Sequence, residues 1–258
     1  MPSKSNLYIL IIIFISLIMG CAFADTYTVS PSGAQSDQKE INKALQKAYD
    51  NGGGIVYLTE GDYYITGPLK IGSNTKLTGD KNAIIHVSSS SSQWFVGAVG
   101  IIVPLNYPLM NVEICDFQLD GNLMSLPTGY ADYAGGDHNA ERAIYLQGIS
   151  NSFMKNIKIH DLQVYNFYSD GIHVQFAQDV QVYSNFVSNC QHSGIFYVSV
   201  ISGLIQANDV AGLTSDCIRI DNGVNCKITG NVLYSYNGTE SNGAYQGGQN
   251  LIQIADQG

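Results

Sequence analysis

Short stretches in which hydrophobic and polar residues alternate recur in the second half of the chain at an interval of 23 residues. Segments 171–193, 194–216 and 217–239 align without gaps. The hydrophobic residues then coincide in four columns: Ile172, Ile195 and Ile218; Val174, Tyr197 and Ile220; Val182, Ile205 and Ile228; Val187, Val210 and Leu233. Alternation predicts strands, because successive strand side chains point to opposite faces. A strand repeat of this length predicts a β-solenoid.

The same pattern extends beyond the three repeats. Residues 143–147 resemble 171–175, and residues 251–254 resemble 217–220. Further upstream, residues 111–122 resemble a later segment, 156–167. We therefore expect one solenoid domain over residues 25–258, with a chain that ends just after a new strand begins, as in a truncated product.

Asn185, Asn208 and Asn231 form a polar column within the repeats. Asparagine is common at turns, where it bonds backbone groups and tolerates a left-handed conformation. We predict that the column lies at a turn and forms a ladder of like residues, which is a structural role.

The N-terminal part predicts a helix followed by strands. Asp37 and Glu40 can form a capping box, and a hydrophobic face follows at Ile41, Leu45 and Ala48. Glycines at 52–54 are expected to end the helix, with a strand at 55–58 and a turn at Gly61-Asp62. The open end of a solenoid needs a cap, and this helix is assigned that role.

Residues 40–80 combine this helix, a Gly-rich turn and the strings Val-Tyr-Leu, Gly-x-Tyr and Ser-Asn-Thr-x-Leu-x-Gly. The stretch resembles the N-terminal cap and first rungs of the pectate-lyase and polygalacturonase superfamily, although Glu60 stands where that family usually has proline. The resemblance implies an all-β fold, a right-handed parallel β-helix with an N-terminal capping α-helix. The middle section, including residues 136–146 and 169–174, is similar to archaeal disaggregatases, which implies a surface protein that cuts an acidic, chondroitin-like matrix.

Charge narrows the range of partners. The formal net charge is −9 and only 13% of residues are charged. An acidic chain argues against a nucleic-acid-binding surface, which needs a basic face. An anionic substrate stays open, because a local basic site can lie in an acidic protein.

The first 24 residues are predicted to be a signal peptide. Lys4 precedes an apolar run over 7–19, and Ala22-Phe23-Ala24 fits the cleavage rule. That run is shorter than the roughly 20 residues of a membrane span. We expect a secreted or cell-surface protein with no integral span after cleavage, and a monomer.

Five cysteines occur, at 21, 115, 190, 217 and 226. None forms a CxxC pair, so a zinc site has weak support. The last four could form disulfides outside the cell or remain buried thiols, and the sequence does not choose.

Candidate chemistry gathers on one predicted face. If the aliphatic columns point inward, an outward column reads Tyr145, His173, Phe196, Arg219 and Gln253, and the next reads Gln147, Gln175, Val198 and Asp221. Just before these strands lie Glu141-Arg142, Ser169-Asp170, His192-Ser193 and Ser215-Asp216. Candidate catalytic residues are Asp170, Asp216, His173, His192 and Arg219; candidate substrate-binding residues are Arg142, Tyr145, Glu141, His138, Phe196 and Asp221.

Two reactions fit these residues. Glycoside hydrolysis needs a protonated acid and a second carboxylate, for which Asp170 with Asp216, two rungs apart, or Asp216 with Asp221 are the candidate pairs. Arg142 and Arg219 could hold a uronate carboxylate. The second reaction, β-elimination, needs a base, which would be Arg219 or a neutral His173.

Other histidines and a long insertion receive different interpretations. Asp170, Asp216 and Asp221 might hold calcium in a lyase, and no metal is otherwise expected. His160 beside Asp161 is expected on a solvated strand edge. His86 is isolated in the sequence and is expected to be a packed or surface histidine and not a ligand. The tyrosine- and glycine-rich insertion 123–142 is expected to form a groove wall that stacks on sugars.

The sequence therefore predicts an exported enzyme that degrades an acidic extracellular polysaccharide, with hydrolysis favoured over elimination. The alternative from another class is a non-catalytic surface-layer or glycan-binding module. A phage-type fibre, which would be a trimer, is the third option. Fold alone does not separate these options, because function depends on the site.

Overall fold

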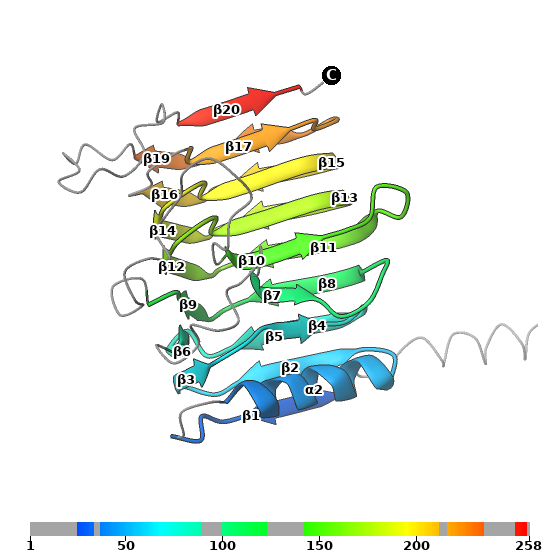
Figure 1. Cartoon of the computed structure of the whole chain (residues 1–258), viewed down its shortest axis with the longest axis vertical. Coiled ribbons are helices and arrows are strands. Elements are labelled where there is room, and N and C mark those ends of the chain that lie inside the picture. Colours follow the sequence, from blue (N-terminus) through cyan, green and yellow to red (C-terminus); the bar gives the residue numbers. More distant parts are fainter. Residues whose placement is uncertain are drawn as a thin grey trace, which may run out of the picture.

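The strands stack in parallel rungs along one long axis (Figure 1). This computed structural model describes residues 25–33, 37–88, 100–122, 142–211, 216–234 and 251–256. Within those ranges, the strand pairings are parallel throughout. The predicted parallel β-helix is confirmed.

Three faces make up the β-helix. Face 1 consists of β4 (Leu69–Ile71), β7 (Gly100–Pro104), β10 (Arg142–Gln147), the first parts of β13 (Ile172–Tyr183) and β15 (Ile195–Gln206), β17 (Ile218–Asp221) and β20 (Ile252–Ala255). Face 2 consists of β1 (Thr26–Val29), β2 (Gly54–Leu58), β5 (Thr75–Gly79), β8 (Met110–Cys115), β11 (Met154–His160), the second parts of β13 and β15, and β18 (Lys227–Thr229). Face 3 consists of β3 (Gly61–Ile65), β6 (Ala83–Val87), β9 (Gln118–Asp120), β12 (Gln163–Phe167), β14 (Phe186–Cys190), β16 (Asp209–Ala211) and β19 (Val232–Tyr234).

Faces 1 and 2 belong to one sheet because β13 and β15 run through both. β13 pairs with β10 up to Gln175 and with β11 from Ala177 onward. Between these pairings, Phe176 has φ 53°, and Ser199 has φ 51° at the equivalent place in β15. A left-handed residue in a strand turns the chain sharply, so these positions form the corner between the two faces.

The register of the stack is the one that the 23-residue repeat predicts. Ile172 lies beside Ile195, which lies beside Ile218. The other three hydrophobic columns, and the similarities of 143–147, 156–167 and 251–254, also correspond to paired positions. Like positions coincide because each turn of a solenoid adds one strand spacing.

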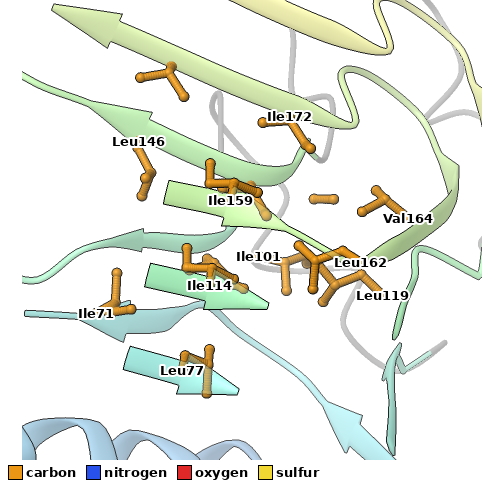
Figure 2. Close-up of a cluster of buried hydrophobic side chains, with 14 of the residues drawn as sticks. Ile71, Leu77, Ile101, Ile114, Leu119, Leu146, Ile159, Leu162, Val164 and Ile172 are labelled. Atoms are coloured by element: carbon orange, nitrogen blue, oxygen red, sulfur yellow. The ribbon is translucent and has the colours of Figure 1, made fainter. Parts of the chain in front are cut away.

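The inward residues of all three faces form one hydrophobic core. Figure 2 shows aliphatic side chains of face 1 (Ile71, Leu146, Ile172), face 2 (Leu77, Ile114, Ile159) and face 3 (Leu119, Val164) meeting in the interior. All eight are fully buried. Burial of a side chain of this size stabilises the fold by about 1.5–3 kcal/mol.

The asparagine column forms the predicted ladder. Oδ1 of Asn208 accepts hydrogen bonds from the backbone N–H and Nδ2 of Asn185, at 3.0 and 2.9 Å. Its own Nδ2 donates to Oδ1 of Asn231 at 2.9 Å and to the Val182 carbonyl at 3.0 Å. The left-handed residues, however, are those just before the ladder: Ser184, Ala207 and Gly230. The asparagines bond backbone groups without adopting that conformation themselves.

Replacing Asn208 by alanine should lower the free energy of unfolding by about 2–4 kcal/mol. The change removes the side-chain acceptor of the buried N–H of Asn185 and one donor to the carbonyl of Val182, and a buried group left unpaired costs about 1–3 kcal/mol. Urea denaturation measures the difference. Asn82→Ala, which removes one exposed side-chain bond to Glu60, is the control and should cost less than about 1 kcal/mol. Equal losses in both variants would show that the ladder adds nothing.

The predicted helix is present as α2 (Gln38–Asp50), at the β1 end of the stack (Figure 1). Its buried face, Ile41, Leu45 and Ala48, joins the core. The predicted capping box is wrong. The carboxylate of Asp37 accepts from the backbone of Ser32 at 2.8 Å and of Tyr64 at 3.0 Å, because the chain before the helix and strand β3 lie against it.

Two other expectations are settled by the local structure. Gly61-Asp62 was expected as a turn, but both residues lie in β3, where Gly61 lies against Ala83. Cys115, Cys217 and Cys226 are free thiols, and Cys115, Cys190 and Cys217 are buried. No helix among the described residues is long and apolar enough to cross a membrane. The predicted signal peptide lies outside the described residues.

Candidate functional site

The outward column on face 1 is confirmed. Tyr145 lies beside His173, His173 beside Phe196, and Phe196 beside Arg219, which lies beside Gln253. The second predicted column, Gln147, Gln175, Val198 and Asp221, is paired in the same way. The strands of face 1 therefore carry the candidate residues on adjacent rungs.

The residues before these strands also stack. The N–H of Ala143 donates to the carbonyl of Asp170 at 3.1 Å, which places Arg142 next to Asp170. The N–H of Gly171 donates to Ser193, and that of Gly194 donates to Asp216, both at 3.0 Å. Ser193 thus lies between Asp170 and Asp216, and the two aspartates are two rungs apart as predicted.

Asp170 is the centre of the cluster. Its carboxylate is fully buried and accepts four hydrogen bonds. Oδ2 accepts from Nδ1 of His173 at 2.8 Å and from Nε of Arg142 at 3.0 Å. Oδ1 accepts from Nδ1 of His192 at 2.6 Å and from the N–H of Ser193 at 3.1 Å. We call Arg142, Asp170, His173 and His192 the Asp170 cluster; it joins three successive rungs.

The donors around Asp170 keep it ionised. Burial alone would raise the pKa of this carboxyl, but the positive charge of His192 and the hydrogen bonds from His173 and His192 outweigh burial. They hold the pKa of Asp170 well below its usual range. Of the candidate pair Asp170 and Asp216, Asp170 is therefore poorly suited to be the protonated acid, and its carboxylate holds two imidazoles.

The two imidazoles have opposite pKa shifts. Burial lowers the pKa of His173 below its ordinary value and outweighs the hydrogen bond that His173 donates to Asp170, which acts in the opposite direction. For His192, burial acts in the same direction, but the charge and hydrogen bond of Asp170 outweigh it and raise the pKa. Both rings present Nδ1 to the carboxylate, so His173 in its neutral form has its proton on Nδ1 and a lone pair on Nε2. The carboxylate thus holds one imidazole whose pKa is lowered and one whose pKa is raised.

Two nitrogens of the cluster are buried without a hydrogen-bond partner in the described structure: Nε2 of His173 and Nη1 of Arg142. An unpaired buried polar atom is costly, and native structures retain few of them. Nε2 of a neutral His173 accepts a hydrogen bond through its lone pair, whereas Nη1 of Arg142 is a positively charged donor. Together they could receive a hydroxyl and an oxygen anion from a ligand.

Aromatic rings enclose the cluster. Tyr145 meets the His173 ring edge-on at 5.0 Å between centroids, and the Arg142 guanidinium lies 4.6 Å from the Tyr145 centroid. Phe196 contacts the His173 ring at 4.7 Å and lies below the Arg219 guanidinium at 4.8 Å. Phe196 is 8% exposed and its ring contacts those of both His173 and His192.

Arg219 is bound to a neighbouring carboxylate. Its Nε and Nη2 donate to both oxygens of Asp221, at 2.8 to 3.2 Å. The hydrogen bonds to Asp221 raise the pKa of the guanidinium above an already high value. These contacts disfavour Arg219 as a base, so of the two candidate bases the structure favours His173, whose pKa is lowered.

The candidate carboxylates do not fit a calcium site. Calcium needs several carboxylate or carbonyl oxygens directed at one point. Asp170 instead faces Arg142 and two imidazoles, and Asp221 faces Arg219. Asp216 is buried at 1% exposure and is the remaining candidate carboxylate of face 1. His138 and Glu141, with most of the insertion 123–142, lie outside the described residues.

Sequence reasoning missed a second histidine cluster, on face 3. Nδ1 of His86 forms a hydrogen bond with Oδ2 of Asp120 at 3.0 Å. Its Nε2 forms a second one with Oδ1 of Asp62, also at 3.0 Å. The hydrogen bond to Asp120 is the main cause of its raised pKa. His86 is isolated in the sequence, but Asp62 and Asp120, 24 and 34 positions away, lie beside it on adjacent rungs. With both nitrogens engaged, His86 has a structural role.

Known proteins resemble this chain. Residues 24–108 match the family model described as rhamnogalacturonase A/epimerase, pectate lyase-like. A probable rhamnogalacturonase E from Aspergillus flavus is 21% identical over 234 residues, which cover 89% of this chain and 49% of that protein. The polygalacturonase of Erwinia carotovora ssp. carotovora superposes with TM-score 0.62 at 15% identity, over 90% of this chain and 68% of its own. The A-module of mannuronan C-5 epimerase AlgE6 from Azotobacter vinelandii gives 0.61 at 19%, over 86% and 60%.

These likenesses establish the class of fold. The chain is a right-handed parallel β-helix protein, similar to pectate lyase-like proteins, as its N-terminal motif implied. It spans about half the length of the curated relatives that it matches. The resemblance to disaggregatases stays a prediction.

Proposed function

We propose that this chain is all or part of an exported enzyme that cleaves an acidic extracellular polysaccharide, with glycoside hydrolysis favoured over β-elimination. The observation that carries the proposal is the Asp170 cluster, in which one buried carboxylate holds His173, whose pKa is lowered, and His192, whose pKa is raised. Titratable groups whose environments push their pKa values apart are suited to act as base and acid. The relatives named rhamnogalacturonase and polygalacturonase support hydrolysis of a pectin-like polymer.

In the hydrolysis that we favour, His192 donates a proton to the glycosidic oxygen as its bond to the anomeric carbon breaks. Nε2 of His173 accepts a proton from the water that attacks this carbon. Asp216 is the candidate second carboxylate. Asp170 is a positioning residue, and Arg142 and Arg219 supply positive charge for a uronate carboxylate. Tyr145, Phe196 and Asp221 line the same face.

One observation favours elimination as a second candidate. Nε2 of His173 and Nη1 of Arg142 are the two unpaired nitrogens of the cluster in the described residues. Elimination from a uronate needs a base at C5 and a cation on the carboxylate. The electrons of the broken C5–H bond would form the C4–C5 double bond, and the leaving oxygen would take the proton of His192.

We expect the purified chain to release new reducing ends from polygalacturonate or rhamnogalacturonan, with no rise in ultraviolet absorbance. Chondroitin sulfate, assayed in parallel, tests the chondroitin-like substrate that the disaggregatase resemblance implies. A joint rise of reducing ends and of the absorbance of an unsaturated uronide would instead support the lyase. His86→Gln, a histidine change on face 3, is the control and should leave the rate unchanged.

The outcome against the proposal is equally definite. If neither signal rises, while polymer still binds and His173→Gln weakens that binding only gradually, the chain is a glycan-binding module. Cleavage that survives in the His173→Gln and His192→Gln variants would place the active site elsewhere.

A further inference from the structure

A polar cluster on face 2 lies outside the site described above. Lys76 of β5 lies beside Glu113 of β8, and Cys115 of β8 lies beside His160 of β11. Tyr183 of β13 follows His160 on the next rung. His160 has strand neighbours on both sides, so its expected place on a strand edge is wrong.

Glu113, Cys115 and His160 present one ligand atom each within 4.8 Å of one another. Oε1 of Glu113 lies 3.6 Å from Nε2 of His160 and 3.8 Å from Sγ of Cys115. Around a tetrahedral zinc ion, ligand atoms at the usual bond lengths are separated by roughly 3.3–3.6 Å. Two of the three separations are therefore within a few tenths of an ångström of those around one ion, and the third, between Sγ of Cys115 and the ligand nitrogen of His160, is at most 4.8 Å.

The surroundings hold the His160 ring in the orientation that a metal requires. Nδ1 of His160 contacts Oδ2 of Asp161 at 2.7 Å, and the ring stacks on Tyr183 at 4.5 Å with an interplanar angle of 7°. A metal-binding histidine usually donates its other ring N–H to a carboxylate, which fixes its tautomer. Asp161 occupies that position, and the lone pair of Nε2 is then directed toward Glu113 and Cys115.

We propose that Glu113, Cys115 and His160 bind one divalent transition-metal ion of the zinc class, with a fourth position open to water. Thiolate and imidazole select zinc over calcium or magnesium, which prefer oxygen ligands. Each of the two adjacent rungs supplies ligands, so the ion would fasten β8 to β11. This site is separate from the Asp170 cluster, and it does not depend on the function proposed there.

Lys76 is the cation that the metal must replace. Its Nζ lies 2.5 Å from Oε1 of Glu113, the same oxygen that faces His160 and Cys115. Its side chain is 34% exposed, so it can swing into solvent when a metal ion binds. An uncharged residue at this position would remove the competitor.

Binding must also displace the proton of Cys115. The thiol donates to Oγ1 of Thr78 at 3.4 Å, and a bound ion would take the place of this proton.

Titration of the metal-free chain with Co²⁺ tests the proposal, because a cysteine thiolate bound to Co²⁺ gives a charge-transfer band in the near ultraviolet. We expect one equivalent to bind and Zn²⁺ to displace it. Cys115→Ser should abolish the band, and His160→Gln should weaken binding about 10- to 100-fold. Lys76→Met should tighten binding about tenfold.

Matched controls separate this site from the other thiols and histidines. Cys226→Ser and His86→Gln remove a cysteine and a histidine outside the cluster and should leave the titration unchanged. Circular dichroism of each variant shows whether it folds. If Cys115→Ser does not fold, the Co²⁺ titrations of His160→Gln and Lys76→Met still test the site. Absence of a band, or a band that survives in both ligand variants, would overturn the proposal.

Discussion

Replacing Asp170 by asparagine should lower the free energy of unfolding by about 3–5 kcal/mol, the usual cost of removing one partner of a buried ion pair. Asparagine has nearly the same shape, so the loss reflects charge and hydrogen bonding. Each oxygen of Asp170 accepts two bonds, and whichever one becomes the NH₂ group must face two donors. Arg142 and His192 would then lie beside a neutral, partly repelling side chain.

The loss of unfolding free energy in Asp170→Asn should depend on pH in a predictable direction. The pKa of Asp170 is lowered, so its contribution is present above its unfolded pKa of about 3.9 and is lost as pH falls toward its folded value. The pKa of His192 is raised, so its contribution is complete below about 6.5 and is lost as pH rises through its folded value. The difference between wild type and Asp170→Asn should be largest between about pH 4 and pH 6.5.

Urea denaturation across this pH range measures the effect. Asp62→Asn is the control, because Asp62 also pairs with a histidine but is 58% exposed. Exposed pairs contribute about 0.2–1 kcal/mol, so the control should change little. If the two variants lose the same small amount, or if the Asp170→Asn difference does not vary with pH, then Asp170 is not the ionised centre of the cluster.

The strand register was predictable from the sequence because a solenoid repeats its environment. Ile172, Ile195 and Ile218 occupy equivalent inward positions, so selection for a buried aliphatic side chain recurs every 23 residues. The outward column that contains His173 and Arg219 follows from alternation alone. Reasoning from period and alternation therefore located the candidate face correctly.

The contacts that this reasoning missed join rungs that contain different numbers of residues. His86 contacts Asp62 and Asp120, 24 and 34 residues away, and His160 contacts Glu113 on a rung 47 residues earlier. These intervals vary because loops of unequal length connect the strands. No fixed period reveals such pairs, and the folded register is needed to find them.

The protonation states of the site residues could not be predicted from the sequence either, because they depend on how deeply each group is buried. From the sequence, Asp170 could be one carboxylate of a hydrolase pair or a calcium ligand. The structure shows an outward position that is nevertheless enclosed, with Arg142, His173 and His192 directed at one carboxylate. The capping box at Asp37 failed for a related reason, since tertiary neighbours took its carboxylate.

His173→Gln and His192→Gln should each lower kcat by about 10²- to 10⁴-fold, the usual contribution of a general acid or base, with a smaller change in KM. The two variants should differ in their pH profiles. His173 must be neutral to accept a proton, so wild-type activity should fall on the acid side, at a pH below the ordinary histidine value of 6.5. His192 must be protonated, so activity should fall on the alkaline side, above 6.5.

Each variant should therefore lose one limb of the wild-type profile. His173→Gln should remove the acid limb, and His192→Gln should remove the alkaline limb, while His86→Gln keeps both. Imidazole titration by NMR gives the two pKa values independently of turnover. If both limbs persist in the histidine variants and Asp216→Asn removes one, then Asp216 is the acid. The imidazoles would then be positioning groups, and the Asp170 cluster would act by shaping the site around a substrate carboxylate.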